Sequence, residues 1–255
     1  MNQLDLFSQC QRWRNHRSEY RPAGEPIDPS RYFVAPIKER DAKEFVLTQH
    51  YSGSYPAAVF RVGLFHKPAF YAEQLVGVAV FSVPCTGAVV TKHLGLKPSS
   101  GIELGRFVLL DKVEANGETW FLRRCFRLLR KYKSYLGVVA YCDPVPRAAV
   151  DGTLVKPGHT GTIYRAFNGS FVGRAKPRTL WLTGQGRVVS ERAISKIRQE
   201  DSGIGYALGQ LLELGAPSPL KGESGAGYVN RVKTSGLLRS FRHPGNYVFT
   251  WDLAA

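Results

Sequence analysis

The chain has few cysteines, one methionine and no long hydrophobic run. Its four cysteines (Cys10, Cys85, Cys125 and Cys142) lack the paired spacing of a zinc site or a disulfide framework. Cys125 and Cys142 lie in apolar stretches and are expected to be small core residues. No apolar segment approaches the ~20 residues that span a bilayer, and the N-terminus lacks the apolar core of a signal peptide. We therefore expect a cytoplasmic protein, in a reducing compartment, with no membrane partner.

Acidic residues are scarce relative to basic ones. The 255 residues include 35 Lys and Arg against 20 Asp and Glu, which gives a formal net charge of +15. Such an excess favours an anionic partner, and we expect double-stranded DNA. With 44% hydrophobic residues, the chain is also long enough to bury the core of one large domain.

Residues 1–30 are expected to form a flexible basic arm, because they are polar and interrupted by prolines. Within this arm, Gln3-Leu4-Asp5-Leu6-Phe7 resembles the short peptide by which bacterial replication and repair proteins dock on the DNA sliding clamp. Leu6 and Phe7 would anchor in a hydrophobic pocket of the clamp, with Gln3 and Leu4 beside them. The alternative is an apolar stub on a disordered tail.

Residues 31–255 are expected to form one catalytic domain. Hydrophobic periodicity predicts strands over 31–37, 56–65, 73–83, 103–110 and 135–143, and helices over 38–50 and about 118–133. An irregular stretch over 144–178 precedes a strand over 178–183. Two short helices are predicted in an insertion over 184–235, which is a candidate for DNA contact. A hairpin turning at His-Pro-Gly-Asn is predicted to close the chain.

This order of elements differs from the regular alternation of a doubly wound parallel sheet. It predicts an α+β fold similar to that of the GCN5-related N-acyltransferases. In that fold a mixed, mostly antiparallel sheet is flanked by helices and splays open between its fourth and fifth strands. The strands at 103–110 and 135–143 would be these two.

In those acyltransferases, amides at the N-terminus of the helix between the two strands hold the pyrophosphate of acetyl-CoA. The corresponding segment here, 111–119, has one glycine, Gly117, and includes the acidic residues Glu114 and Glu118. The acetyl-CoA site is therefore expected to be degenerate.

Polar residues at expected strand ends and loops are candidates for chemistry. His50 and Tyr51 follow the first helix, where a histidine could be a general base or a metal ligand, or simply cap the helix. Arg106 interrupts an apolar strand and could orient a carboxylate or phosphate, or form a salt bridge to Glu103 or Asp143. Asp143 ends a buried strand, where it could bind a metal or be a turn residue before proline.

Tyr164 and His159 lie in a glycine-rich segment, KPGHTGTIYRAFNGSFVG. Its glycines permit close approach to a ligand, its aromatic rings could stack on a base, and Tyr164 could donate a proton. The alternative is an ordinary loop with hydrophobic anchors.

Basic residues outside the arm are expected to contact phosphates, which gives affinity without sequence choice. The strongest candidates are Arg123 and Arg127 on the long helix, Arg187, Arg192, Lys196 and Arg198 in the insertion, and Arg242 near the end.

The segments HYSGSYP, ELGRFVLL, YCDP, GTIYRAFNGSFVG and TLWL, in this order over roughly residues 30–185, resemble the Mom family of phage DNA-modification proteins. The resemblance implies a transferase that converts adenine in DNA to its N6-carbamoylmethyl form and protects phage DNA from host restriction. It implies an active-site group of His50, Tyr51, Arg106 and Asp143, with Tyr164 less certain because the loop before it is long.

The same resemblance implies either iron, for which His50 and Asp143 are the candidate ligands, or acetyl-CoA as the cofactor. Two other functions stay open from the sequence. One is a protein or small-molecule N-acyltransferase of the same fold. The other is a non-enzymatic DNA-binding protein, which has no need for His50, Arg106 and Asp143 to converge.

Overall fold

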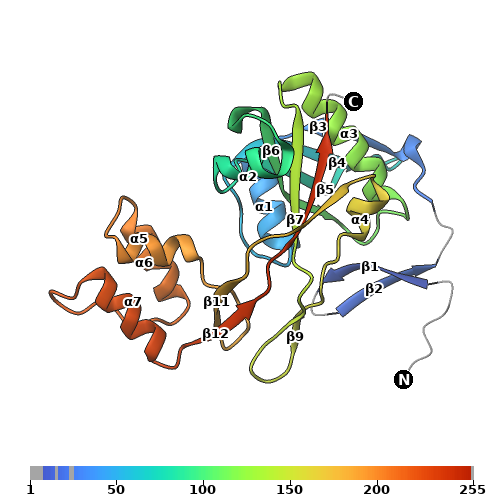
Figure 1. Cartoon of the computed structure of the whole chain (residues 1–255). Helices are drawn as coiled ribbons and strands as arrows, with labels where there is room; N and C mark the ends of the chain where they lie inside the picture. Colours follow the sequence, from blue (N-terminus) through green and yellow to red (C-terminus); the bar gives the residue numbers. More distant parts are fainter. Residues whose placement is uncertain (1–7, 15–16, 23–25, 254–255) are drawn as a thin grey trace. The chain divides into compact units, whose positions relative to one another are not determined.

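The computed structural model describes residues 8–14, 17–22 and 26–253 (Figure 1). These residues form two compact units. Unit 1 contains the described residues up to Pro144, together with His159–Arg174 and those from Asn246 onward. Unit 2 contains Val145–Gly158 and Ala175–Gly245. The segment Gln3–Phe7 lies outside the described residues.

Unit 1 is built on a seven-stranded sheet. Its strands in spatial order are β10 (Ser170–Arg174), β13 (Tyr247–Asp252), β7 (Gly137–Cys142), β6 (Gly101–Leu109), β5 (Gln74–Ser82), β4 (Ala58–His66) and β3 (Tyr32–Pro36). All neighbouring strands are antiparallel except β6 and β7, which run parallel. These two pair only over Gly101–Leu104 and Gly137–Ala140, although both strands continue further. The predicted α+β fold, with a sheet that opens between these two strands, is confirmed.

Helices cover both faces of this sheet (Figure 1). The helix α1 (Glu39–Gln49) buries Ala42 and Val46 against Val78 and Val80 of β5. The helix α2 (Gly87–Leu94) contacts β6, β7 and β13. The sequence did not predict α2, because Gly, Ser and Pro surround it. Two short 3-10 helices, η1 (Pro29–Arg31) and η2 (Pro98–Ser100), precede β3 and β6.

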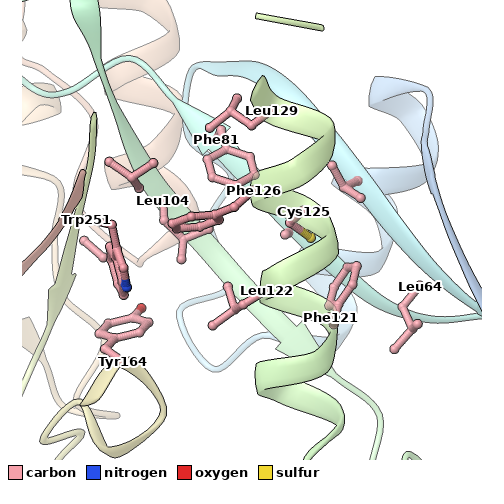
Figure 2. Close-up of a cluster of buried hydrophobic side chains, with 14 of the residues drawn as sticks. Leu64, Phe81, Leu104, Phe121, Leu122, Cys125, Phe126, Leu129, Tyr164 and Trp251 are labelled. Carbon is pink, nitrogen blue, oxygen red and sulfur yellow. The ribbon is translucent and has the colours of Figure 1, made fainter. Parts of the chain in front are cut away.

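The helix α3 (Gly117–Tyr132) covers the opposite face and packs its apolar side into the core there (Figure 2). Its apolar side chains, Phe121, Leu122 and Cys125 among them, recur at helical spacing and are fully buried. Tyr164 of the short helix α4 (Thr162–Ala166) and Trp251 of β13 extend the same cluster. The core of unit 1 thus joins α3 to the segment that contains Tyr164.

Unit 2 has a core of its own. The strands β11 (Arg178–Thr183) and β12 (Leu238–His243) pair antiparallel. Three helices, α5 (Glu191–Arg198), α6 (Ile204–Glu213) and α7 (Gly225–Thr234), pack together through buried side chains such as Ile197, Leu211 and Tyr228. The helices predicted at α5 and α6 are confirmed, whereas the glycine-rich α7 was not predicted. The short strands β8 (Arg147–Ala148) and β9 (Leu154–Lys156) form a ribbon.

The predicted C-terminal hairpin is wrong. The strands β12 and β13 flank Pro244 and Gly245, but β12 pairs with β11, while β13 lies between β7 and β10. The residues between β12 and β13 are typical of a hairpin turn, but the two strands pair elsewhere because their apolar side chains are buried in different cores. Leu238 belongs to the core of unit 2, and Phe249 and Trp251 belong to the core of unit 1.

Two further regions have more regular structure than predicted. In the arm that was expected to be flexible, β1 (Ser8–Arg14) and β2 (Arg17–Pro22) pair antiparallel. The stretch 144–178, predicted to be irregular, contains β8, β9, α4 and β10. Among the described helices, none combines the length and the apolar composition needed to cross a membrane.

Gly161, directly before α4, has φ +83°, and a Cβ there would stand 2.3 Å from the ring of Phe249. Gly161→Ala should therefore lower the free energy of unfolding by about 3 kcal/mol, through backbone strain and displacement of a buried ring. Gly95 is the matched control, because it has φ +66° with open space around it, and Gly95→Ala should cost about 1 kcal/mol. Denaturant unfolding measures both. Equal losses would contradict this account of α4.

Candidate active site where the sheet opens

A β-bulge places Glu103 and Arg106 on the same face of β6. Glu103 lies opposite Ser82 and Arg106 opposite Val80, two residues apart on β5, and the register shifts by one residue at Gly105. Without this extra residue, side chains three positions apart would point to opposite faces. Gly105 is required, because a Cβ there would stand 2.3 Å from Oγ of Ser82.

Arg106 ties the loop after α1 to β6. Its Nε donates to the carbonyl oxygen of Ser54 (2.9 Å), and its Nη2 donates to the Ser54 hydroxyl (2.8 Å). Nη1 donates to the carbonyl oxygen of Gly105. These bonds, rather than an ion pair with Glu103, fix the guanidinium. The loop that follows His50 is thereby held beside the opening of the sheet.

His50 ends α1 and is stacked on Tyr51, with ring centroids 4.3 Å apart. Its Nδ1 accepts the backbone N–H of Ser52 (3.1 Å) and lies 2.9 Å from the Ser52 hydroxyl. Burial, followed by electrostatic interaction with Arg106 and His159, lowers the pKa of His50 to about 3. The ring is therefore neutral at pH 7 and carries its proton on Nε2, so it can donate a hydrogen bond there.

His159 joins the site through a backbone contact with Asp143. The chain leaves unit 1 after Pro144 and returns at His159, whose N–H donates to the carbonyl oxygen of Asp143 (2.7 Å). Nδ1 of His159 accepts the N–H of Gly161 (3.0 Å), and its ring lies 5.4 Å from that of Tyr164. The sequence placed His159 in the glycine-rich segment but did not select it as a site residue.

Tyr164 is buried between Phe249 and Trp251, with ring centroids 5.5 and 5.4 Å away. Burial raises the pKa of Tyr164 far above its usual value, and Cys142, Tyr51 and Glu103 raise it further. The hydroxyl therefore stays protonated at physiological pH. It can donate a hydrogen bond, but it cannot serve as a base.

Glu103 was not selected as a site residue from the sequence, which indicated it only as a possible salt-bridge partner of Arg106. Its half-buried carboxyl makes no hydrogen bond and no ion pair with any residue in the described ranges. Burial raises the pKa of Glu103 to about 7, and the positive charge of Arg106 only partly opposes this. No sequence pattern announces such a shift, since it depends on the bulge and on the neighbouring strands.

The residues at this site do not fit a metal ion such as iron. Among the described residues, no group of three or more His, Cys, Asp and Glu side chains could hold one. A metal-binding imidazole usually donates a hydrogen bond from its other ring nitrogen. In His50 and His159, Nδ1 instead accepts a backbone N–H, which leaves the proton on Nε2. The geometry does not support the prediction that His50 and Asp143 bind a metal.

The N-terminus of α3 does not fit a cofactor pyrophosphate either. The N–H of Ile27 donates to the loop before this helix (2.8 Å). Glu114 in the same loop accepts hydrogen bonds from Arg31 (3.1 Å) and from the Tyr32 hydroxyl (2.6 Å). Glu118, buried in the first turn, adds a negative charge at the positive end of the helix. The loop before α3 is thus held by internal contacts, and its acidic residues disfavour an anion there.

The basic residues that are predicted to contact phosphates lie in both units. Arg123 and Arg127 are exposed on α3 in unit 1. The others lie in unit 2, where all are exposed except the half-buried Lys196: Arg187, Arg192, Lys196, Arg198 and Arg242. The Nζ of Lys196 donates to the carbonyl oxygen of Ser202 (2.7 Å).

Comparison with known proteins gives one family and several distant folds. A sequence model of the Mom protein family matches residues 31–213. No curated protein matches the chain. Among solved structures, a GNAT family N-acetyltransferase from Escherichia coli in complex with CoA is 12% identical, with a TM-score of 0.36, over 55% of this chain and 69% of that one. A tandem GNAT protein from the clavulanic acid biosynthesis pathway, without acetyl-CoA, is 9% identical, with a TM-score of 0.36, over 60% of this chain and 48% of that one.

The ring of His50 should remain neutral from pH 8 down to pH 5, because burial, and after it the neighbouring Arg106 and His159, disfavour the imidazolium. Nitrogen-detected NMR of the labelled histidines measures this directly. Nδ1 should have the shift of an unprotonated acceptor throughout the range. A titration of His50 with a midpoint near its usual value of 6.5 would contradict the described geometry.

Proposed function

The chain belongs to the Mom protein family, and we propose that it is a DNA-modifying transferase that converts adenine in double-stranded DNA to N6-carbamoylmethyladenine. In a bacterial host cytoplasm this modification would protect phage DNA from restriction. The observation that carries the proposal is a convergence of polar side chains where β6 and β7 part. His50 interacts electrostatically with Arg106 and His159, Arg106 interacts with Tyr51 and Tyr164, and the backbone joins His159 to Asp143.

The proposed chemistry begins with a poor nucleophile. The lone pair of the adenine N6 amine is delocalised into the ring, so the protein must orient the amine and assist the loss of its proton. Duplex geometry hides N6, so the base must be flipped out, at a cost of a few kcal/mol. Tyr51, a residue that is 47% exposed, offers a ring on which the base could stack.

Each side chain of the group then has a distinct task. Asp143, at the end of β7, orients the N6 hydrogens. Nε2–H of His50 and the Tyr164 hydroxyl are neutral donors that can stabilise negative charge developing on the carbon donor. Arg106 holds the loop after α1 and supplies a fixed positive charge. No step in this scheme requires a metal or a bound pyrophosphate.

Two alternatives fit the observations less well. A conventional N-acyltransferase would bind the pyrophosphate of acetyl-CoA at the N-terminus of α3, where Glu114 and Ile27 make internal contacts. A protein that only binds DNA would not need polar side chains to meet at the core of the sheet. Saturable acetyl-CoA binding without DNA would favour the first alternative, and unmodified DNA the second.

Duplex DNA is the proposed partner of the basic surfaces, and the α3 surface is the best defined of them. Arg123 and Arg127 are exposed there, and neither forms an ion pair with a described residue. Arg124 stacks on Trp120, with its Cζ 3.3 Å from the ring centroid. Burial lowers the pKa of Arg124, and the like charges of Arg127 and Arg123 lower it further. Phosphates would relieve this uncompensated repulsion.

Docking on the bacterial sliding clamp through Gln3, Leu4, Leu6 and Phe7 is proposed from the sequence alone. Such a contact would bring the protein to newly replicated DNA. Its logic is a short peptide with two apolar anchor residues, Leu6 and Phe7.

The double variant Arg123→Glu, Arg127→Glu should weaken duplex binding and reduce the slope of log affinity against log salt by about 2, because two phosphate contacts are lost. Arg40→Glu, Lys43→Glu on α1 is the control, since it changes the net charge equally on another exposed surface. Fluorescence anisotropy at several salt concentrations measures both. Equal slopes for the two double variants would contradict a specific role for α3.

Nucleoside mass spectrometry of DNA from expressing cells tests the proposed function. The wild type should yield N6-carbamoylmethyladenine, and Asp143→Asn should lower the yield about 100-fold or more, because an amide cannot hold the N6 hydrogens as a carboxylate does. Asp151→Asn is the control, since this carboxylate is exposed and caps a turn in unit 2. Unmodified adenine with the wild type would refute the assignment.

A further inference from the structure

We propose that an exposed surface of α4, β10 and β13 binds the DNA strand that carries the target adenine. Arg165 and Arg174 would contact phosphates, and Phe171 would stack against a nucleotide beside the flipped base. The inference rests on the proposed function, because it names the surface that holds the substrate outside the opening of the sheet. None of these three residues is among those expected from the sequence to contact phosphates.

A β-bulge brings the residues of this surface onto one face of the sheet. Phe171 lies opposite Phe249, Arg174 lies opposite Tyr247, and the register between β10 and β13 shifts at Val172. Phe249 and Tyr247 are two positions apart on β13, so they point to the same face. Because of the bulge, Phe171 and Arg174 share that face as well, although they are three positions apart. The surface therefore combines an aromatic ring and a guanidinium group that regular alternation would separate.

The two arginines lie over aromatic rings. Cζ of Arg165, on α4, is 5.3 Å from the ring centroids of both Phe171 and Phe249. Cζ of Arg174 is 4.9 Å from the ring centroid of Tyr247, and its Nη2 donates to the Tyr247 hydroxyl (3.1 Å). The ring of Phe171 lies 5.3 Å from that of Tyr247. These contacts hold both guanidinium groups in place before a ligand arrives, which reduces the entropy cost of binding.

Neither arginine has a carboxylate partner. Arg165 and Arg174 are exposed, and neither forms an ion pair with a described residue. The helix α4 and the strand β10 contain no acidic residue. The sole acidic residue of β13 is Asp252, at the opposite end of that strand from Tyr247. The surface thus carries ordered positive charge that can pair with phosphates, to which the planar fork of a guanidinium is suited.

The surface adjoins the candidate active site through one buried ring. The ring of Phe249 lies 5.5 Å from that of Tyr164 and 5.5 Å from that of Phe171. Arg165 directly follows Tyr164 on α4. DNA bound at this surface would therefore pass beside Tyr164, with the flipped adenine in the opening and the next nucleotide at Phe171. Phe171 is 46% exposed, so its ring can replace the base on which that nucleotide stacked in the duplex.

A strand of a second copy of the chain is the other occupant to consider, because β10 is the edge strand of the sheet. The strand itself disfavours this pairing. It has five residues, contains the bulge and ends in Arg174, and short, bulged or charged edges oppose pairing between sheets. The net charge of +15 on each copy adds repulsion. Duplex DNA, as a polyanion, fits the surface better.

Duplex binding at several salt concentrations tests the role of the arginines in the full-length protein. The double variant Arg165→Gln, Arg174→Gln should reduce the slope of log affinity against log salt by about 2, because two phosphate contacts are lost. Arg40→Gln, Lys43→Gln on α1 is the matched control, since it removes the same charge from another exposed surface. The control should keep the slope of the wild type.

Phe171→Leu separates stacking from charge, because leucine keeps an apolar contact with Phe249 but has no aromatic face. The variant should bind a duplex with a mispaired adenine about tenfold more weakly than the wild type does, with the salt slope unchanged. Phe70→Leu is the control, since Phe70 is 93% exposed between β4 and β5. It should bind as the wild type does.

The outcomes separate the inference from the proposed function. If the wild type modifies adenine but the arginine double variant and Phe171→Leu keep its affinity and slope, the inference is overturned while the proposed function stands. If sedimentation shows a wild-type dimer that Phe171→Leu dissociates with DNA affinity unchanged, the surface joins two copies and the inference is overturned. If the variants lose affinity as expected but adenine stays unmodified, the DNA-binding surface stands and the proposed reaction fails.

Discussion

The parting of β6 and β7 is the constraint on which the rest of unit 1 depends. Each strand keeps its outer neighbour, β5 or β13, but the two pair with each other over only four residues. Backbone groups beyond that point need other partners, because buried polar groups are rarely left unsatisfied. Polar segments from elsewhere in the chain therefore pack at the opening and form hydrogen bonds there. It receives the loop after α1 through Arg106 and the start of α4 through the contact between His159 and Asp143.

The sequence predicted those helices and strands whose formation depends on local residue patterns. The spacing of Phe121, Leu122 and Cys125 on α3 and the continuous apolar run of β7 identify these elements without tertiary information. Local patterns were also enough to select His50 at the end of a helix, Arg106 as a charge within an apolar strand, and Asp143 at the end of β7. The degenerate loop at Glu114 was also visible, although its internal contacts with Arg31 and Tyr32 were not.

The features that the sequence did not predict depend on contacts across long separations. His159 reaches Asp143 only because the intervening residues leave unit 1 and return. A single bulged glycine places Glu103 and Arg106 on the same face of β6, and the position of this bulge depends on pairing with β5, a strand that is distant in the sequence. The hairpin error has the same origin, since the partners of β12 and β13 are decided by two separate cores.

Charge is distributed unevenly in this basic protein, and the distribution would suit the reaction proposed for it, on a base within DNA. The exposed arginines of α3 carry fixed positive charge that phosphates can neutralise. At the opening of the sheet, burial instead favours the neutral forms of His50, Glu103 and Tyr164, with Arg106 as the fixed cation among them. In the proposed function, a flipped adenine is itself neutral, so it would enter such a site without displacing a counter-ion. Affinity for the backbone and chemistry on the base can therefore be set by different residues, because surface charge acts through phosphates and burial acts through proton affinity.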